Sequence, residues 1–132
     1  PSATWEGVLK YLFIYINMEI YVYLICCTDV NGNKMHKIGF TKRSVEKRIK
    51  EFKTGNANDF YLIDSFKSKW GTKIEASLKR RFKKYNISGE WFDLSDVDIL
   101  NFGKVCETLH DGFEFMANNN TYYQDRENIN FL

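Results

Sequence analysis

The chain has 132 residues, of which 44% are hydrophobic and 17% aromatic, enough to build the core of one compact domain. A single proline and 8 glycines exclude a long disordered or low-complexity chain. The 3 cysteines leave at least one unpaired and show no Cys-x-x-Cys spacing, so neither a disulfide framework nor a zinc site is indicated. We therefore expect an intracellular protein in a reducing compartment.

The net charge of +2 hides an uneven distribution of charge along the chain. Residues 34–84 contain 16 Lys or Arg against 5 Asp or Glu, an excess of 11, whereas the remainder is acidic. A basic middle between acidic ends indicates one positive face, to which a polyanion such as nucleic acid would bind. Lysine-rich helices with an ordinary solvated face would give the same count, so charge alone leaves both interpretations open.

The chain divides into an N-terminal extension, a patterned domain and a tail. We expect residues 1–18 to form the extension, as a helix or edge strand that covers a sheet. An apolar run through residues 8–27 is interrupted by Lys10, Asn17 and Glu19, which argues against a membrane span. The domain is expected over residues 19–111, and residues 112–132 mix Asn with aromatic residues, as in an irregular C-terminal tail.

Three strands are predicted. Residues 20–27 are apolar at successive positions, which is typical of a strand buried on both faces. Asn31-Gly32 predicts a tight hairpin, with the returning strand over residues 34–40. Residues 59–66 predict a third strand from their aromatic and β-branched content. The expected fold is α+β, a small, mostly antiparallel three-stranded sheet flanked by helices.

Three helices are predicted from apolar spacing and end signals. Ser44 is placed to cap a helix that ends near residue 53, and a basic second helix is expected over residues 72–85. Ser95 is placed to cap a third helix, which Gly112 is expected to end. Between the second and third helices, residues 90–94 predict a short strand or an extended segment.

Tyrosine, lysine and arginine side chains are expected to meet at one corner of the sheet. Tyr21 and Tyr23 share a face of the first strand because strand side chains alternate, while Lys37 lies on the neighbouring strand and Arg48 on the following helix. A phenol can exchange a proton, and Lys and Arg can neutralise a phosphate. A carboxylate would complete a metal-assisted phosphodiester site, and Glu75 is the best-placed candidate.

The order of these motifs resembles the GIY-YIG nuclease superfamily, and most of all its phage- and virus-type branch with Lys-Ile-Gly as the second motif. The resemblance extends over about residues 19–94, with Ile20 standing where the superfamily's first motif has glycine. The matching segments are Tyr21-Val22-Tyr23-Leu24-Ile25, Lys37-Ile38-Gly39-Phe40-Thr41, Val45-Glu46-Lys47-Arg48-Ile49, Ile74-Glu75-Ala76-Ser77-Leu78 and Gly89-Glu90-Trp91-Phe92.

The resemblance implies a role for each motif residue. Tyr23, with Tyr21 as its alternative, would help to deprotonate the attacking water. Lys37 would act as a base or orient the nucleophile, and Arg48 would stabilise the charge of the phosphorane-like transition state. Glu75 would hold a single divalent ion, Mg²⁺ or Mn²⁺.

Each assignment has a structural alternative. Tyr23 could simply pack in an aromatic core, and Arg48 could be an ordinary solvated cation. Thr72 to Glu75 matches a capping box, in which the Glu75 carboxylate would accept from the Thr72 amide instead of holding a metal. A further polar position of the superfamily would fall on either Glu90 or Asn86.

The resulting hypothesis is a metal-dependent endonuclease that hydrolyses phosphodiester bonds, with DNA favoured as the substrate. The alternatives are a catalytically inactive GIY-YIG-like module that binds nucleic acid, and a phage or viral protein-interaction (inhibitor) protein. No membrane partner is expected, whereas a protein partner or a homo-oligomer stays open. Cations expected to bind phosphates irrespective of sequence are Lys42, Arg43, Lys47, Lys50, Lys79, Arg80 and Lys83.

Overall fold

The computed structural model describes residues 4–16, 19–53 and 59–119. Its centre is a five-stranded sheet with the order β3-β1-β2-β5-β4, in which every pairing is antiparallel. The α+β prediction is confirmed, and two short strands join the three main ones at one edge. The strands are β1 (Ile20–Thr28), β2 (Lys34–Thr41), β3 (Asp59–Ser68), β4 (Asn86–Ser88) and β5 (Trp91–Phe92).

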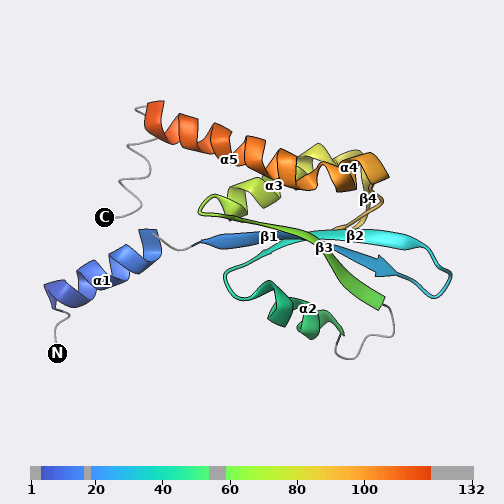
Figure 1. Cartoon of the computed structure of the whole chain (residues 1–132), viewed down its shortest axis with the longest axis horizontal. Helices are drawn as coiled ribbons and strands as arrows, with labels where there is room; N and C mark the ends of the chain where they lie inside the picture. The colour runs from blue at the N-terminus through green and yellow to red at the C-terminus, as the bar shows by residue number, and fades with distance from the viewer. Residues whose placement is uncertain (1–3, 17–18, 54–58, 120–132) are drawn as a thin grey trace.

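Helices cover both faces of the sheet (Figure 1). On one face lie α3 (Gly71–Arg81) and α5 (Phe102–Asn119), the latter preceded by the short α4 (Asp96–Leu100). The opposite face is covered by α2 (Val45–Lys53). A 3₁₀ turn, η1 (Lys83–Tyr85), connects α3 to β4. The basic helices α2 and α3 therefore lie on opposite sides of the sheet.

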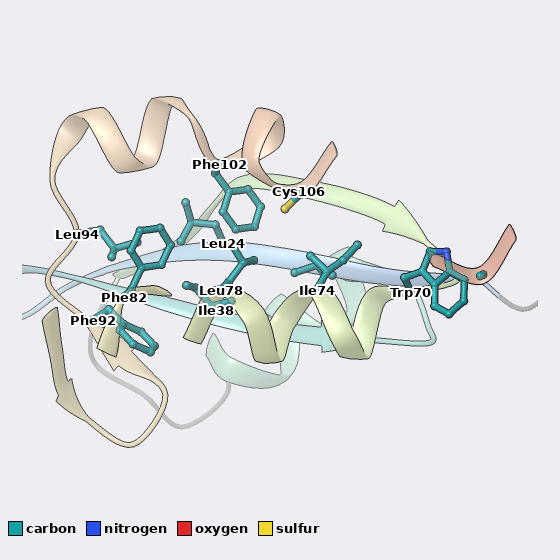
Figure 2. Close-up of a cluster of buried hydrophobic side chains, with 12 residues drawn as sticks. Leu24, Ile38, Trp70, Ile74, Leu78, Phe82, Phe92, Leu94, Phe102 and Cys106 are labelled. Atoms are coloured by element: carbon teal, nitrogen blue, oxygen red, sulfur yellow. The ribbon is translucent and has the colours of Figure 1, made fainter. Parts of the chain in front are cut away.

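Strand β1 contributes to a hydrophobic core on each face, as its continuous apolar sequence predicts. Val22 and Leu24 belong to the larger core, under α3 and α5, with Ile74 of α3 (Figure 2). Tyr23 and Ile25 belong to the smaller core, under α2. Because alternate side chains point to opposite faces, Tyr23 is directed away from α3.

The β1–β2 hairpin is longer than the tight Asn-Gly turn that the sequence predicts. Gly32 has a positive φ of 81°, but Asn31 does not, so a two-residue turn with two positive φ angles is absent. Asp29 organises the loop instead, because its Oδ1 accepts from the backbone nitrogens of Asn31 at 2.8 Å and Asn33 at 2.9 Å. The resulting register pairs Tyr23 with Gly39.

The helix starts agree with the sequence better than the helix ends. Ser44 lies just before α2, and its hydroxyl accepts from the backbone of Lys47. Ser95 caps a helix as expected, but that helix is the short α4, and the single third helix that the sequence predicts is divided at Asn101 into α4 and α5. The prediction that Gly112 ends the last helix is wrong, since α5 continues to Asn119. Glu114, beyond that glycine, accepts a hydrogen bond from the indole of Trp70 at 2.9 Å, which fastens this part of α5 to the fold.

The N-terminal segment forms α1 (Trp5–Ile16), which extends away from the body of the molecule (Figure 1). Trp5 is 79% exposed and Tyr11 68%, so the expectation that this segment covers the sheet is wrong. In the described ranges, no helix combines the length and apolar character needed to cross a bilayer.

All three cysteines are buried as thiols, and no disulfide joins them. Burial raises the pKa of the Cys106 thiol to about 12. This thiol is therefore protonated near neutral pH and is a packing residue of the larger core. The absence of a disulfide framework agrees with the sequence.

Candidate active site

The ring of Tyr23 crosses over strand β2 because the residue opposite it is a glycine. A Cβ atom built on Gly39 would lie 2.4 Å from the Tyr23 hydroxyl oxygen and 2.6 Å from Cζ, closer than non-bonded atoms approach. Only glycine leaves room for the phenol at this position. The glycine of the Ile-Gly pair thus has a steric function, which is to let the hydroxyl of a buried tyrosine extend across β2.

Strand β2 loses its outer neighbour at this same place. Strand β5 pairs with β2 only at His36 and Lys37, and no other described strand pairs with residues 38–41 on that side. Side chains from the two faces of a sheet are normally separated by its backbone. At an open edge they can reach the same space, so groups from α2 and α3 can act together here.

Arg48 of α2 reaches the Tyr23 hydroxyl. Its guanidinium lies within hydrogen-bonding reach of the phenol, sits 4.8 Å from the ring centroid of Phe52, and pairs with Glu51 at 2.9 Å. Burial raises the pKa of Tyr23, and the nearby Arg48 opposes that rise. The phenol is therefore protonated near neutral pH, and Arg48 stabilises its phenolate form whenever the proton leaves.

Lys37 lies on the same face of the sheet as Tyr23. Its Nζ atom is 4.2 Å from the ring centroid of Phe52 and 3.1 Å from Oε2 of Glu90. The side chain is only 13% exposed, since Phe52 and Trp91 flank it. Phe52 is thus a shared platform for the two cations of the site, Lys37 and Arg48.

Glu75 approaches the edge from α3, on the other face. Its side chain is 11% exposed, and Oε1 lies 3.4 Å from the Nζ atom of Lys79. Burial raises the pKa of Glu75, and Lys79 opposes the rise. The capping-box alternative is wrong: α3 begins at Gly71, so Thr72 lies inside the helix and no side chain caps its start. The Glu75 carboxylate pairs with Lys79 instead.

Glu90 connects the two faces. Its Oε2 atom lies 3.1 Å from Lys37 and its Oε1 atom 3.1 Å from Lys79. Burial alone would raise the pKa of Glu90, but the two lysines hold it below its usual value. The carboxylates of Glu90 and Glu75 also act to raise the pKa of Tyr23, so both lie within electrostatic reach of the phenol.

The structure therefore brings Tyr23, Lys37, Arg48 and Glu75 to one edge of the sheet. Tyr21 packs at the margin of the smaller core, and the Nζ atom of Lys67 lies 5.7 Å from its ring centroid. Tyr23, not Tyr21, is the tyrosine beside Arg48.

Sequence reasoning left Glu90 and Asn86 as equal candidates and did not identify Phe52. Asn86 closes the β4–β5 turn, donating to the carbonyl oxygens of Gly89 at 2.8 Å and Trp91 at 3.1 Å, so Glu90 is the one that lies in the site. Phe52 lies one helical turn after Arg48, a spacing at which side chains meet, and this signal could have found it.

The cations predicted to bind phosphates belong to α2 and α3, to the loop before α2 and to the turn after α3. Lys79 is partly covered by its two carboxylate partners. Arg43 also pairs with Glu51 at 3.1 Å, and Arg80 donates to the Ser77 hydroxyl. The exposed members of the set are Lys42, Arg43, Lys47, Lys50, Arg80 and Lys83.

A family model for the T5orf172 domain matches residues 20–114. The chain belongs to this family. The T5orf172 domain is phage-associated and falls in the clan of GIY-YIG- and HNH-like endonucleases, so membership is compatible with a nuclease or a nucleic-acid-binding role. The four converging residues lie within the matched part of the domain. Searches among curated proteins and among solved structures gave no match.

The sequence predicts Glu75 as the ligand of a divalent ion, and its surroundings can be compared with what such an ion needs. Within the described residues, no group of three or more His, Cys, Asp or Glu side chains could hold a metal. Mg²⁺ is usually bound through one or two carboxylates, with waters and substrate phosphates completing its shell. The nearly buried carboxylate of Glu75 fits that requirement, since it supplies one protein ligand and leaves the remaining positions of the shell to waters and a phosphate.

Proposed function

We propose that this T5orf172 domain is an endonuclease that hydrolyses phosphodiester bonds in DNA, with Mg²⁺ or Mn²⁺ as its cofactor and with residue roles of the GIY-YIG type. The observation that supports this most is the convergence of Tyr23, Arg48 and Glu75, from β1, α2 and α3, on one open edge of the sheet. A hydrophobic core needs neither an arginine against a buried phenol nor a carboxylate nearby.

Tyr23 is the proton acceptor in this proposal. The phenolate form takes a proton from the attacking water as the water oxygen bonds to phosphorus and one ester P–O bond breaks. The leaving oxygen then takes a proton from solvent. Because burial raises the pKa of Tyr23, only a small fraction of the protein carries the phenolate near neutral pH, and Arg48 increases that fraction.

Arg48 and Lys37 stabilise the charge that develops on the phosphate. Arg48 is about one-third exposed, so its donors can turn from Glu51 towards a phosphate oxygen. Lys37 is held by Phe52 on the same face and orients the nucleophile or the phosphate. Fixed cations at a partly enclosed edge stabilise a transition state more effectively than mobile ones, because little reorganisation accompanies the reaction.

Glu75 would hold the divalent ion, and the bound ion would supply positive charge that neutralises the phosphate oxygens. The helix that carries Glu75 fixes the position of the carboxylate relative to Tyr23. Ionising a nearly buried carboxylate costs free energy, and a bound cation offsets that cost better than the 3.4 Å contact with Lys79. We place the protein inside the cell, where its substrate would be nucleic acid.

A second candidate function is nucleic-acid binding without cleavage. It is favoured by the ion pair between Lys79 and Glu75, which competes with a metal for the same carboxylate. The exposed cations of α2 and α3 would serve this function equally well, because phosphate contacts need no catalytic group.

The test is nicking of supercoiled plasmid DNA with Mg²⁺ or Mn²⁺. We expect the wild-type protein to nick, and Glu75→Gln to lose activity by about 10²- to 10³-fold or more. Glu107→Gln is the matched control, since Glu107 is an exposed glutamate of α5, and it should retain full activity. A wild-type protein that binds DNA but leaves it intact with both ions would favour the second candidate function.

A further inference from the structure

One carboxylate in the site is held the way a phosphate would be. The two oxygens of Glu90 each contact a different lysine at 3.1 Å, Oε2 with Lys37 and Oε1 with Lys79. The two non-bridging oxygens of a phosphodiester present the same pair of acceptors to two ammonium groups. The lysines thus already form a two-point anion site, and the protein fills it with its own side chain.

Glu90 is the most exposed member of this group. Its side chain is 50% exposed, against 13% for Lys37 and 27% for Lys79, so the carboxylate lies between the lysines and solvent. It is carried by the β4–β5 turn, whose described residues 86–90 are all exposed. Displacing the carboxylate therefore requires only a rotation of a solvated side chain and leaves the core intact.

The anion site lies where the proposed reaction needs a phosphate. Lys37 shares its sheet face with Tyr23, whereas Lys79 is one helical turn from Glu75 on α3. An anion held between the lysines is therefore placed at the sheet edge, between the proposed proton acceptor and the proposed metal ligand.

We propose that Glu90 is an internal substitute for a substrate phosphate. In the free protein it occupies the site formed by Lys37 and Lys79, and a phosphodiester group of the bound nucleic acid displaces it. The identification of the ligand as a phosphodiester of nucleic acid rests on the proposed function. The displacement of Glu90 requires only that nucleic acid binds, not that it is cleaved. Glu90 thereby weakens the binding of polyanions. A ligand binds at the site only if its other contacts with the protein offset the cost of displacing the Glu90 carboxylate.

A purely structural role for Glu90 makes a different prediction. If Glu90 only fastened the β4–β5 turn to β2 and α3, its loss would loosen the site and leave DNA binding unchanged or weaker. If it occupies a phosphate site, its loss exposes two lysines and strengthens binding. The direction of the change distinguishes the two roles.

The experiment measures the affinity for a short labelled DNA duplex by fluorescence anisotropy, with EDTA present so that no cleavage occurs. We expect Glu90→Gln to bind about fivefold more tightly than wild type, the order of effect of removing a competing exposed ion pair. Its binding should also depend more steeply on salt, by up to about one additional phosphate contact, a slope change near 0.9.

Glu19→Gln is the control for net charge. Glu19, just before β1, is 46% exposed and pairs with Lys67 of β3 at 2.6 Å, so the substitution removes the same charge from another exposed ion pair. Its affinity should stay close to wild type. An equal gain in Glu19→Gln, or no gain in a folded Glu90→Gln, would overturn the proposal.

Two further variants test whether the increase in DNA affinity comes from the lysines, and they keep the proposal testable if Glu90→Gln does not fold. Lys79→Gln should weaken binding more in the Glu90→Gln background than in wild type, because only there is the lysine fully available. Glu90→Asp keeps the charge but is too short to contact both lysines, so it should also bind more tightly than wild type. Unchanged affinity in Glu90→Asp, should Glu90→Gln not fold, contradicts the proposal.

These measurements separate the inference from the proposed function. A protein that never nicks DNA can still show tighter binding by Glu90→Gln, in which case only the endonuclease proposal fails. A protein that nicks DNA but whose Glu90→Gln variant binds no more tightly leaves the endonuclease proposal intact and removes the phosphate-substitute role.

Discussion

Helix α3 and the β4–β5 turn each bring one carboxylate to the site, and they hold it in opposite ways. On α3, Glu75 lies beside Ile74 and one turn from Leu78, both of which are 0% exposed. The start of this helix is packed so closely that a Cβ atom on Gly71 would lie 2.5 Å from Ile20. In the turn, a Cβ on Gly89 would meet nothing within 4 Å, and Glu90 itself is half-exposed.

The difference relates the mobility of each carboxylate to its proposed role. A metal ligand has to keep its position relative to the proton acceptor, and a helix locked into a core supplies that rigidity. A side chain that a phosphate must displace needs the opposite, an exposed segment with few buried contacts. Each of the following experiments perturbs one side of this comparison.

The largest effect is expected on the fixed side, at the proton acceptor. Tyr23→Phe removes the hydroxyl but keeps the ring packed over Gly39, so the fold should persist while nicking falls by about 10²- to 10⁴-fold. The control is Tyr21→Phe, on the same face of β1, which should keep near wild-type activity. The measurement is the nicking rate under single-turnover conditions, and equal losses in the two variants would contradict the assignment of Tyr23.

The pH dependence of nicking is a second test of Tyr23 as the proton acceptor. Since burial raises the pKa of Tyr23 above its usual value, the phenolate fraction increases with pH throughout the neutral range. The nicking rate should therefore rise by about tenfold per pH unit between about pH 7 and pH 9. A flat profile over this range would exclude the phenolate as the base that limits the rate.

A smaller effect is expected from methyl groups added to the glycines of the two regions. Gly71→Ala forces α3 away from Ile20, which should cost about 1–3 kcal/mol of unfolding free energy and displace Glu75, reducing nicking. Gly89→Ala has space around it but a φ of 53°, so it should cost about 1–2 kcal/mol through the backbone alone and leave nicking by the folded protein unchanged.

Gly112→Ala is the control for the added methyl group. It lies within α5 with nothing within 4 Å of the new Cβ, so it should stabilise the protein by about 0.5–1 kcal/mol. Urea denaturation measures all three variants. If Gly71→Ala proves as harmless as Gly112→Ala, α3 is not the rigid support described above.

Local sequence patterns were enough to predict the elements that position the candidate site. The apolar run of β1, the return of β2 and the Ser44 cap of α2 are signals carried by neighbouring residues, and they place Tyr23, Lys37 and Arg48 on adjoining elements. The steric role of Gly39 was not predicted, since it depends on the register that pairs Gly39 with Tyr23. The strands and the helix start, in contrast, depend on the chemistry of neighbouring residues.

Features that depend on contacts between distant residues were not predictable in the same way. The capping box at Thr72 is overridden because the Ser68 hydroxyl accepts from the Trp70 backbone and α3 starts earlier than the box requires. Helix α5 passes Gly112 because Glu114 bonds to Trp70. The bridge that Glu90 makes between the two faces requires knowing where β2 loses its neighbour, which no local pattern records.

The smallest expected effect compares the two carboxylates through stability. Because burial raises the pKa of Glu75, its ionised form destabilises the folded state at neutral pH, and Glu75→Gln should raise the unfolding free energy by on the order of 1 kcal/mol. Glu90 behaves oppositely: its lysines hold its pKa down, so Glu90→Gln should lose up to about 1 kcal/mol, the range of exposed ion pairs.

The pH dependence of these two changes follows from their signs. Below the usual carboxyl pKa, Glu75 is protonated in both the folded and the unfolded protein, so the advantage of Glu75→Gln disappears as the solution is acidified. The contribution of Glu90 is complete above that pKa and is lost as the pH falls through its lowered folded value. Urea denaturation at a series of pH values from about pH 7 down to about pH 3 should thus show two variants that deviate from wild type in opposite directions near neutral pH and approach it in acid, Glu75→Gln at a higher pH than Glu90→Gln. If Glu75→Gln were instead the less stable variant near neutral pH, the ion pair of Glu75 with Lys79 would outweigh the cost of its burial, and the ionised carboxylate would stabilise the fold as that of Glu90 does.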